Sequence, residues 1–415
     1  MIRTIPLALV TALLVGVPIY WAFPDGLSGW RSAAIVMGWA GCGLLLANLF
    51  LVIRESWLAK QLGGLEQMYV WHHRLGVVAY LVLLCHPLAL ALDSWNEHPS
   101  LARAVLDPWQ QGWPGWLGWL ALLCLMIGMN SALTPRTSYS TWRWQHWLLA
   151  IAIVFSVAHL FVLGLDFALL WSPFLAIGFI VWRVVRADWG MAAKPFVVSE
   201  VNSPAKDIVE VLLKPLSHAI QARPGQFVLA AFHDGPHFRG CREFHPFTIS
   251  AIRQDGALSL GIKALGDCTR HLQTLESGVS ARIQGPFGDF LSENISTSSL
   301  WIAGGIGITP FLARLRAGPP VHPVRLIYLY RTEQDAAFIQ ELQGFERSYP
   351  SFSLTCKVGG SAAPPFSEMI PETRELLSLN CFLCGPPGLV AAAVNYLTAQ
   401  GVSGDKIHFE RFDFR

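Results

Sequence analysis

Six apolar segments before residue 190 limit what this chain can fold into, because each is long enough to cross a lipid bilayer. A transmembrane helix needs about 20 apolar residues, and the segments cover residues 4–23, 32–53, 70–92, 114–133, 144–164 and 166–185. Only 14% of the 415 residues are charged, whereas soluble proteins carry about a quarter. The sequence therefore predicts a membrane protein whose residues 1–190 form a six-helix transmembrane bundle.

Basic residues in the loops predict how this bundle is oriented. Loops on one side hold only Arg31 and Arg103, whereas the other side is rich in Arg and Lys. The positive-inside rule places the basic loops in the cytoplasm, together with both termini. The stretch Tyr20–Pro24 lacks a small-residue cleavage site, so the first segment is expected to be a retained helix. The basic side comprises Arg3, Arg54, Lys60, Arg136, Arg143, Arg183, Arg186 and Lys194.

The pattern changes near Lys194, which predicts a second half outside the membrane. Alternating apolar runs at 208–213 and 258–262 indicate strands separated by turns. After Ser299 the order strand, glycine turn, helix indicates an α/β layer. We therefore expect an antiparallel β-barrel at 195–293 and an α/β domain at 296–415. The eight cysteines are scattered and do not form a secreted disulfide framework, and the net charge of +2 gives no reason to expect a nucleic-acid partner.

Four histidines within the apolar segments indicate metal ligands, since ionisable groups inside a bilayer are costly. His72 and His86 are 14 residues apart on the third segment, and His146 and His159 are 13 apart on the fifth. At 1.5 Å per residue, each pair spans about 20 Å along its helix. Two such helices can hold two stacked haems, each iron bound by one imidazole from each helix. His72 and His146 would hold the inner haem, and His86 and His159 the outer one.

This assignment leaves two points open. Successive helical residues turn by about 100°, so His159 lies about 140° around the helix from His146 and the fifth segment must twist, bulge or use different rotamers. His73 is an alternative inner ligand, although His72 shares a helix face with His86. Arg74 and Arg143 at the cytoplasmic level are candidates to bind the haem propionates.

The β-rich half contains a set of residue types suited to a flavin. In this set an aromatic and a hydroxyl suit the isoalloxazine ring, while glycines and a lysine suit the pyrophosphate. A Gly-Pro turn closes the module. Each motif alone is weak, but their order and separation are specific. The predicted FAD-binding residues are His245, Pro246, Phe247, Thr248, Lys263, Gly266, Thr269 and Gly285.

The last domain contains a dinucleotide pattern. Leu300–Pro310 predicts a strand that enters a glycine turn and then a helix, which is the usual place for a pyrophosphate. A second strand ends at Cys384-Gly385-Pro386, where the carboxyl edge of a sheet would hold the nicotinamide. Arg331 is a candidate for a 2′-phosphate, which favours NADPH over NADH, and Cys381 with Cys384 leaves a minor metal-site alternative. The predicted NAD(P)-binding residues are Gly304, Gly305, Gly307, Thr309, Pro310, Arg331, Cys384, Gly385 and Pro386.

Together these motifs resemble the NADPH oxidase and ferric reductase family in its compact prokaryotic form, across nearly the whole chain. The resemblance implies FAD in a ferredoxin-reductase-like barrel, NAD(P)H in the last domain, two b-type haems and a bacterial inner (plasma) membrane. It also implies a C-terminal aromatic over the flavin, best matched by Phe412, with Phe414 as the alternative. Phe412 and Cys384 are therefore the predicted catalytic residues.

The predicted function is electron transfer across the membrane from cytoplasmic NAD(P)H, through FAD and the haems, to an extracytoplasmic acceptor. With two histidines on each iron no axial position is open, so transfer to the acceptor would be outer-sphere. Oxygen, giving superoxide, is the preferred acceptor, and a ferric chelate is the alternative. A proton channel or sensor without haem is the non-enzyme alternative, but it leaves the flavin and nucleotide motifs unexplained.

Overall fold

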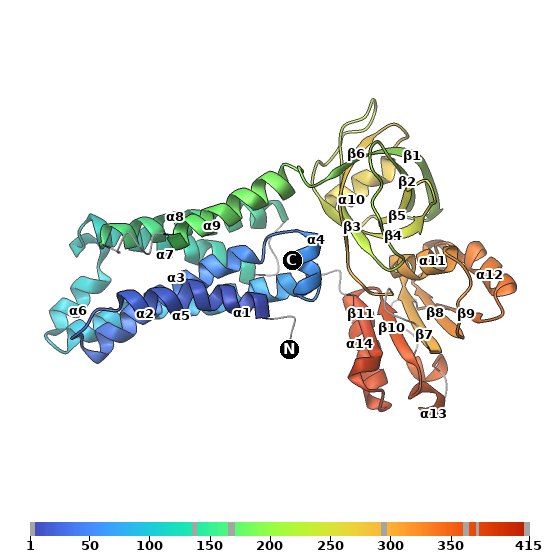
Figure 1. The fold of residues 1–415 in the computed structure, drawn as a ribbon. Coiled ribbons are helices and arrows are strands. Elements are labelled where there is room, and N and C mark those ends of the chain that lie inside the picture. Colours follow the sequence, from blue (N-terminus) through green and yellow to red (C-terminus); the bar gives the residue numbers. More distant parts are fainter. Residues whose placement is uncertain are drawn as a thin grey trace. The chain divides into compact units, whose positions relative to one another are not determined.

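The computed structural model describes residues 5–134, 139–164, 171–291, 297–359, 365–370 and 373–410. The chain divides into two compact units. The first contains residues 1–54, 61–63 and 67–184, and the second contains 55–60, 64–66 and 185–415. Each unit is described separately below, with the elements labelled as in Figure 1.

The first unit is helical. Its N-terminal helix has three parts, because the π-helical turn η2 (Ala12–Gly16) separates α1 (Ile5–Thr11) from α2 (Val17–Ala22). Long apolar helices follow, and α7 and α8 pack along each other (Figure 1). The elements after α2 are α3 (Gly29–Phe50), α5 (Leu65–Trp95), α6 (Pro99–Leu106), η3 (Pro108–Gln110), α7 (Trp113–Leu133), α8 (Tyr139–Val162) and α9 (Trp171–Trp182).

Four of these helices are long and apolar enough to cross a membrane: α3, α5, α7 and the Thr141–Val162 part of α8. The remaining two predicted segments, 4–23 and 166–185, correspond to shorter pieces in the described part of the chain. The first contains an apolar helix over Leu7–Trp21, and the described part of the second is α9, which continues at Arg183 into the π-helical segment η5 (Arg183–Asp188). Membrane-like helices are therefore present, but the predicted count of six is not confirmed.

The helices hold together around an apolar core and leave many large apolar side chains on the outside, as expected for contact with lipid. Leu14, Leu46, Ala79, Leu125 and Ala152 are core members from five different helical segments. The exposed set includes Leu81, Leu88, Leu123, Ile151, Val154 and Phe161.

The second unit contains the predicted barrel. Its six strands close in the order β1-β2-β5-β4-β3-β6, with antiparallel pairing throughout. Inward-facing apolar residues such as Val211, Ile249 and Leu260 fill its interior, and the short helix α10 (Asp267–His271) follows β5. The strands are β1 (Lys194–Ala205), β2 (Ile208–Pro215), β3 (Phe227–Phe232), β4 (His245–Ile252), β5 (Leu258–Lys263) and β6 (Ser280–Phe287).

The α/β layer follows in the same unit as a parallel sheet of order β11-β10-β7-β8-β9. Its central strand β7 (Ser299–Gly304) is fully buried and leads through η7 (Gly305–Ile308) into α11 (Thr309–Arg316). This is the predicted strand, glycine turn and helix. The remaining elements are β8 (Val324–Tyr330), α12 (Ile339–Ser348), β9 (Phe352–Val358), α13 (Thr373–Leu376), β10 (Asn380–Cys384), α14 (Pro387–Ala399) and β11 (Ile407–Glu410).

Two further features of the second unit were not predicted from the sequence. The short helix α4 (Ser56–Gln61), which precedes the long helix α5, is assigned largely to this unit, where Glu55 forms an ion pair with Arg186. Cys241 and Cys268 form a disulfide that joins the loop before β4 to α10. That bond closes a loop between the two segments predicted to bind FAD, and so restricts their motion relative to each other.

Candidate functional site

The structure brings together one histidine from α5 and one from α8 at the level predicted for the inner haem. The centroids of the His72 and His146 rings are 6.1 Å apart, with an angle of 60° between the ring planes. A metal–imidazole bond is about 2 Å long, so a single iron with one ligand on each side fits a gap of this size. The neighbouring His73 is exposed. The geometry therefore favours His72 over His73.

The second pair, His86 and His159, lies close enough to interact electrostatically. The helix α8 is a continuous α-helix from Tyr139 to Val162, so it has no bulge between His146 and His159.

The ring nitrogens show which atoms are available to a metal. Nδ1 of His86 contacts the Ala34 carbonyl at 2.7 Å, and Nδ1 of His159 contacts the Pro114 carbonyl at 2.7 Å. His72 Nδ1 lies 3.4 Å from the Asn48 carbonyl, which is a long contact. Metal-binding histidines commonly donate one ring N–H to a carbonyl and bind the metal through the other nitrogen. Three of the four histidines therefore have Nε2 available as an iron ligand.

Two glycines make room for the outer pair of imidazoles. A Cβ on Gly38 would lie 3.0 Å from His86 Nδ1, and a Cβ on Gly118 would lie 3.1 Å from His159 Cε1. Each glycine stands four residues after the carbonyl that its histidine contacts, and residues spaced by four share a helix face. An alanine at either position would crowd the ring.

The fourth histidine has a different environment. Trp142 stacks on His146, with ring centroids 5.0 Å apart and planes at 19°, and His146 Nδ1 is buried with no hydrogen-bond partner among the described residues. The predicted propionate ligands Arg74 and Arg143 are both exposed, and Arg74 lies over the Trp71 ring. Their role stays a prediction.

In the barrel, the predicted flavin residues lie along β4 and at the end of β5. Pro246 and Thr248 alternate with His245 and Phe247, and Phe247 is buried in the barrel core. Burial lowers the pKa of His245, an effect opposed by the nearby Glu243. His245 therefore favours the neutral form, and its buried Nε2 has no hydrogen-bond partner in the described structure.

The turn after β5 is stabilised by the side chain of Thr269. Thr269 Oγ1 accepts hydrogen bonds from the backbone N–H groups of Leu265 and Gly266, each at 2.9 Å. Gly285, two residues before the end of β6, has a φ of 122°, a conformation that favours glycine. Lys263 ends β5 and is half-buried.

The glycines of the nucleotide motif bring two strand ends into close contact. A Cβ on Gly304 would lie 2.4 Å from Leu389 Cδ2, and a Cβ on Gly307 would lie 2.3 Å from the Cys384 carbonyl oxygen. A Cβ on Gly385 would lie 3.0 Å from the Cα and the backbone nitrogen of Gly304. The turn after β7 and the carboxyl end of β10 thus meet at one edge of the sheet, where α/β proteins commonly bind nucleotides. Thr309 and Pro310 are buried, whereas Arg331 is exposed.

Three close approaches join this edge to the barrel within the second unit. A Cβ on Gly261 in β5 would lie 2.5 Å from Thr309 Cγ2. A Cβ on Gly305 would lie 3.6 Å from Lys263 Nζ. In addition, a Cβ on Gly288, which follows β6, would lie 2.9 Å from a carboxyl oxygen of Glu410. The residues predicted to bind flavin and those predicted to bind nicotinamide therefore border one region.

Cys384 lies at this edge as a buried thiol. Burial, and then the charge of Glu410, raises its pKa well above the usual value, so it is not an activated thiolate. The Cys-x-x-Cys alternative gains no support, since no group of three or more His, Cys, Asp or Glu that could hold a metal occurs in the described ranges. Phe412 and Phe414 lie outside the described residues.

Glu410 belongs to the same edge, although no motif in the sequence predicted it. It ends β11, opposite Cys384 in the strand register, and its Oε2 is buried without a hydrogen-bond partner among the described residues. Burial, and then the charge of Glu66 in the same unit, raises the pKa of its carboxyl from 4.5 to about 8. Only its position beside the C-terminal aromatics was a possible signal. At neutral pH it can therefore serve as a hydrogen-bond donor.

The raised pKa of Glu410 predicts a pH dependence of stability. A carboxyl whose pKa is higher in the folded state makes its full contribution to the stability of the folded protein below pH 4.5. This contribution is lost as the pH rises through about 8. We expect the unfolding temperature of the full chain to fall between pH 5 and pH 8.5, and Glu410→Gln to flatten this slope. The exposed Glu368→Gln is the control. If the unfolding temperature of Glu410→Gln falls with pH as steeply as that of the wild type, Glu410 does not have the raised pKa of a buried acid.

Comparison with known proteins identifies two parts of the chain. Residues 37–157 match the family model described as a ferric reductase like transmembrane component. Residues 193–305 match the family model described as an FAD-binding domain.

Curated relatives match the second half. The toluate 1,2-dioxygenase electron transfer component of Pseudomonas putida is 28% identical over 230 residues, covering 52% of this chain and 66% of that protein. NADH-cytochrome b5 reductase 1 of Emericella nidulans is 28% identical over 279 residues, covering 56% of this chain and 88% of the relative. The chain thus spans just under two thirds of the length of the first relative. A solved flavohaem-like FAD/NAD-binding domain of nitric oxide dioxygenase from Vibrio cholerae O1 biovar El Tor is 20% identical, with a TM-score of 0.46, and covers 53% of this chain and 98% of that domain.

The fold, the two family models and the curated relatives define a membrane oxidoreductase with an FAD-binding domain and an NAD(P)-binding reductase fold. A ferric-reductase-like transmembrane component followed by an FAD-binding domain is the arrangement of the ferric reductase and NADPH oxidase-like flavocytochromes, so the predicted resemblance to that family is confirmed. Because the chain is an oxidoreductase, the channel or sensor alternative is set aside.

Proposed function

We propose that the chain transfers electrons across a membrane, from cytoplasmic NAD(P)H through FAD and two b-type haems to an extracytoplasmic acceptor. The main support for this proposal is that the rings of His72 and His146 lie close together within the region that matches the ferric-reductase-like transmembrane component. FAD would supply the step from a two-electron hydride donor to one-electron carriers, which haem requires. We keep a bacterial inner membrane, six spans and cytoplasmic termini as parts of the proposal, together with the domains 1–190, 195–293 and 296–415.

The chain's own residues have distinct tasks in this scheme. The glycines around Gly307 bring the nucleotide turn against the edge that holds Cys384, where nicotinamide would bind. Neutral Glu410 avoids placing a negative charge at that edge and can donate a hydrogen bond there. In the first unit, the carbonyls of Ala34 and Pro114 fix the outer-haem imidazoles in one tautomer.

The preferred acceptor is O₂, which would give superoxide. A ferric chelate is the second candidate, favoured by the description of the matching family model. Superoxide dismutase separates them: it should block reduction of a superoxide-sensitive dye if O₂ is the acceptor, and should not slow reduction of a ferric chelate if iron is.

The proposal is tested by the anaerobic absorbance spectrum of the purified protein before and after NADPH, with NADH in parallel. Sharp reduced b-haem bands that appear with the nucleotide and vanish in air are expected. Protein that contains no haem after expression with ample haem supply would overturn the haem part. Haem that only dithionite reduces would overturn the path from the nucleotide.

A further inference from the structure

The helix α11 connects the nucleotide turn to the barrel. Its first residues, Thr309 and Pro310, belong to the nucleotide motif, and its last residue is Arg316. Eight residues at 1.5 Å each make a rod of about 12 Å. Along this length α11 packs against β4, which carries the predicted flavin residues His245–Thr248. The position of α11 on the barrel therefore sets the position of the nucleotide turn relative to the flavin residues.

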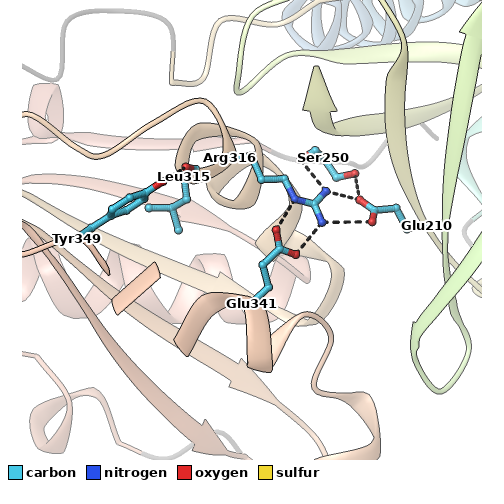
Figure 2. Close-up of polar contacts among 6 residues, drawn as sticks. All are labelled: Glu210, Ser250, Leu315, Arg316, Glu341 and Tyr349. Carbon is cyan, nitrogen blue, oxygen red and sulfur yellow. Dashed lines mark hydrogen bonds and ion pairs between the residues drawn. The ribbon is translucent and has the colours of Figure 1, made fainter. Parts of the chain in front are cut away.

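Arg316 anchors the C-terminal end of this rod to the barrel (Figure 2). Nη1 and Nη2 of its guanidinium contact the two carboxyl oxygens of Glu210 in β2, and Nη1 also donates to the Ser250 carbonyl in β4 at 3.3 Å. The Ser250 hydroxyl in turn donates to Glu210. Ser250 lies two residues beyond Thr248 on the strand that carries the flavin motif.

The same guanidinium is also fixed within the α/β layer. Its Nε and Nη2 donate to the carboxyl oxygens of Glu341 in α12, both at 2.7 Å, and it lies 5.4 Å from the centre of the Phe338 ring. The guanidinium thus makes five polar contacts: two with Glu210, one with the Ser250 carbonyl and two with Glu341. They match the five N–H donors of an arginine, which a lysine cannot reproduce. The Arg316 side chain is 20% exposed and Glu210 only 13%, so solvent screens this pair less than a surface ion pair.

The N-terminal end of α11 contacts the barrel through a different residue. Gly261 in β5 faces Thr309 and Ile306 so closely that a Cβ would lie 2.5 Å from one and 3.1 Å from the other. The helix is thus attached by an ion-pair cluster at one end and by a glycine contact at the other.

We propose that Arg316 is a positioning residue for hydride transfer: by linking the end of α11 to Glu210 of the barrel, it fixes the nucleotide turn at the distance that the flavin requires. The inference rests on the proposed function, since it assumes that NAD(P)H reduces FAD in this chain. It assigns the Glu210–Arg316 pair a role in the reaction rate, and not only in stability.

The test compares two variants that each remove one carboxylate from the same guanidinium. Glu210→Gln breaks the link to the barrel, whereas Glu341→Gln leaves that link and breaks only the one inside the α/β layer. Anaerobic stopped-flow mixing of the full-length protein with NADPH gives the rate of flavin reduction. We expect Glu210→Gln to slow it by up to about 100-fold, since a misplacement of about 1 Å can cost that much. FAD content and NADP⁺ affinity should not change. Glu341→Gln should stay close to the wild-type rate.

Two further measurements keep the inference testable if Glu210→Gln destabilises the protein. Arg316→Lys keeps the positive charge but loses the planar guanidinium that contacts both carboxylates. It should also slow flavin reduction at unchanged NADP⁺ affinity. Hydrogen exchange on the full chain should be faster in α11 and β4 of Glu210→Gln than of Glu341→Gln, which reports the position of the helix without any turnover.

Each outcome decides the matter. A wild-type rate in Glu210→Gln or in Arg316→Lys would overturn the positioning role. Equal slowing by Glu210→Gln and Glu341→Gln, in step with equal losses of unfolding temperature, would show a purely structural role and overturn it as well. If neither NADPH nor NADH reduces the flavin of the wild-type protein, the proposed function fails, and this inference fails with it.

Discussion

His146→Ala is expected to remove the inner haem and to abolish electron transfer to the extracytoplasmic acceptor. His146 faces His72 at 6.1 Å between ring centroids, so its loss leaves the iron with one protein ligand. Loss of a partner that merely orients a ligand lowers metal affinity by about 10- to 100-fold, and loss of the ligand itself should cost at least that. Pyridine haemochrome absorbance should fall to half of the wild-type value, and acceptor reduction by more than about 100-fold.

The matched control for this variant is His73→Ala. His73 is adjacent to His72 in sequence but exposed, so its removal should leave haem content and turnover unchanged. Reduction of the flavin by NADPH should also be unchanged in His146→Ala, because the flavin residues belong to the second unit. Full haem content in His146→Ala, or loss of the inner haem in His73→Ala, would refute the assignment of His72 and His146.

The sequence predicted the parts of the fold whose signal is local. The strands at 208–213 and 258–262 lie within β2 and β5, and the glycine turn after β7 opens α11 as predicted. Alternation and strand–turn–helix order depend on neighbouring residues, so a single sequence contains them. Membrane histidines are rare enough to be noticed one by one, and their spacing together with the expected direction of each helix predicted which would pair, with His73 left as an alternative.

Features that depend on contacts distant in sequence were missed. Glu210, Arg316 and Glu341 come together from three elements that share no local motif. The partner of Cys241 could not be assigned, because spacing does not determine connectivity. The segments 4–23 and 166–185 were predicted as spans from their apolar content, and the described residues do not confirm that they span a membrane.

The nucleotide edge provides the second large effect, which Gly307→Ala should produce. A Cβ at this position would lie 2.3 Å from the Cys384 carbonyl oxygen and 2.5 Å from its carbonyl carbon. Both are backbone atoms of the buried strand β10, so no side-chain rotation relieves the clash and the turn must move away from Cys384. Because the turn and the strand end together form the predicted nicotinamide site, KM for NADPH should rise by more than about tenfold. The unfolding free energy should fall by about 1–3 kcal/mol, as in other overpacked sites. Haem content should not change, which separates this defect from that of His146→Ala.

Gly344→Ala in α12 is the control, because nothing lies within 4 Å of the added methyl group and alanine stabilises a helix interior by about 0.5–1 kcal/mol. If Gly307→Ala binds NADPH like the wild type, the nucleotide is not held between the turn after β7 and the end of β10, and the path of hydride entry proposed for this chain must be abandoned.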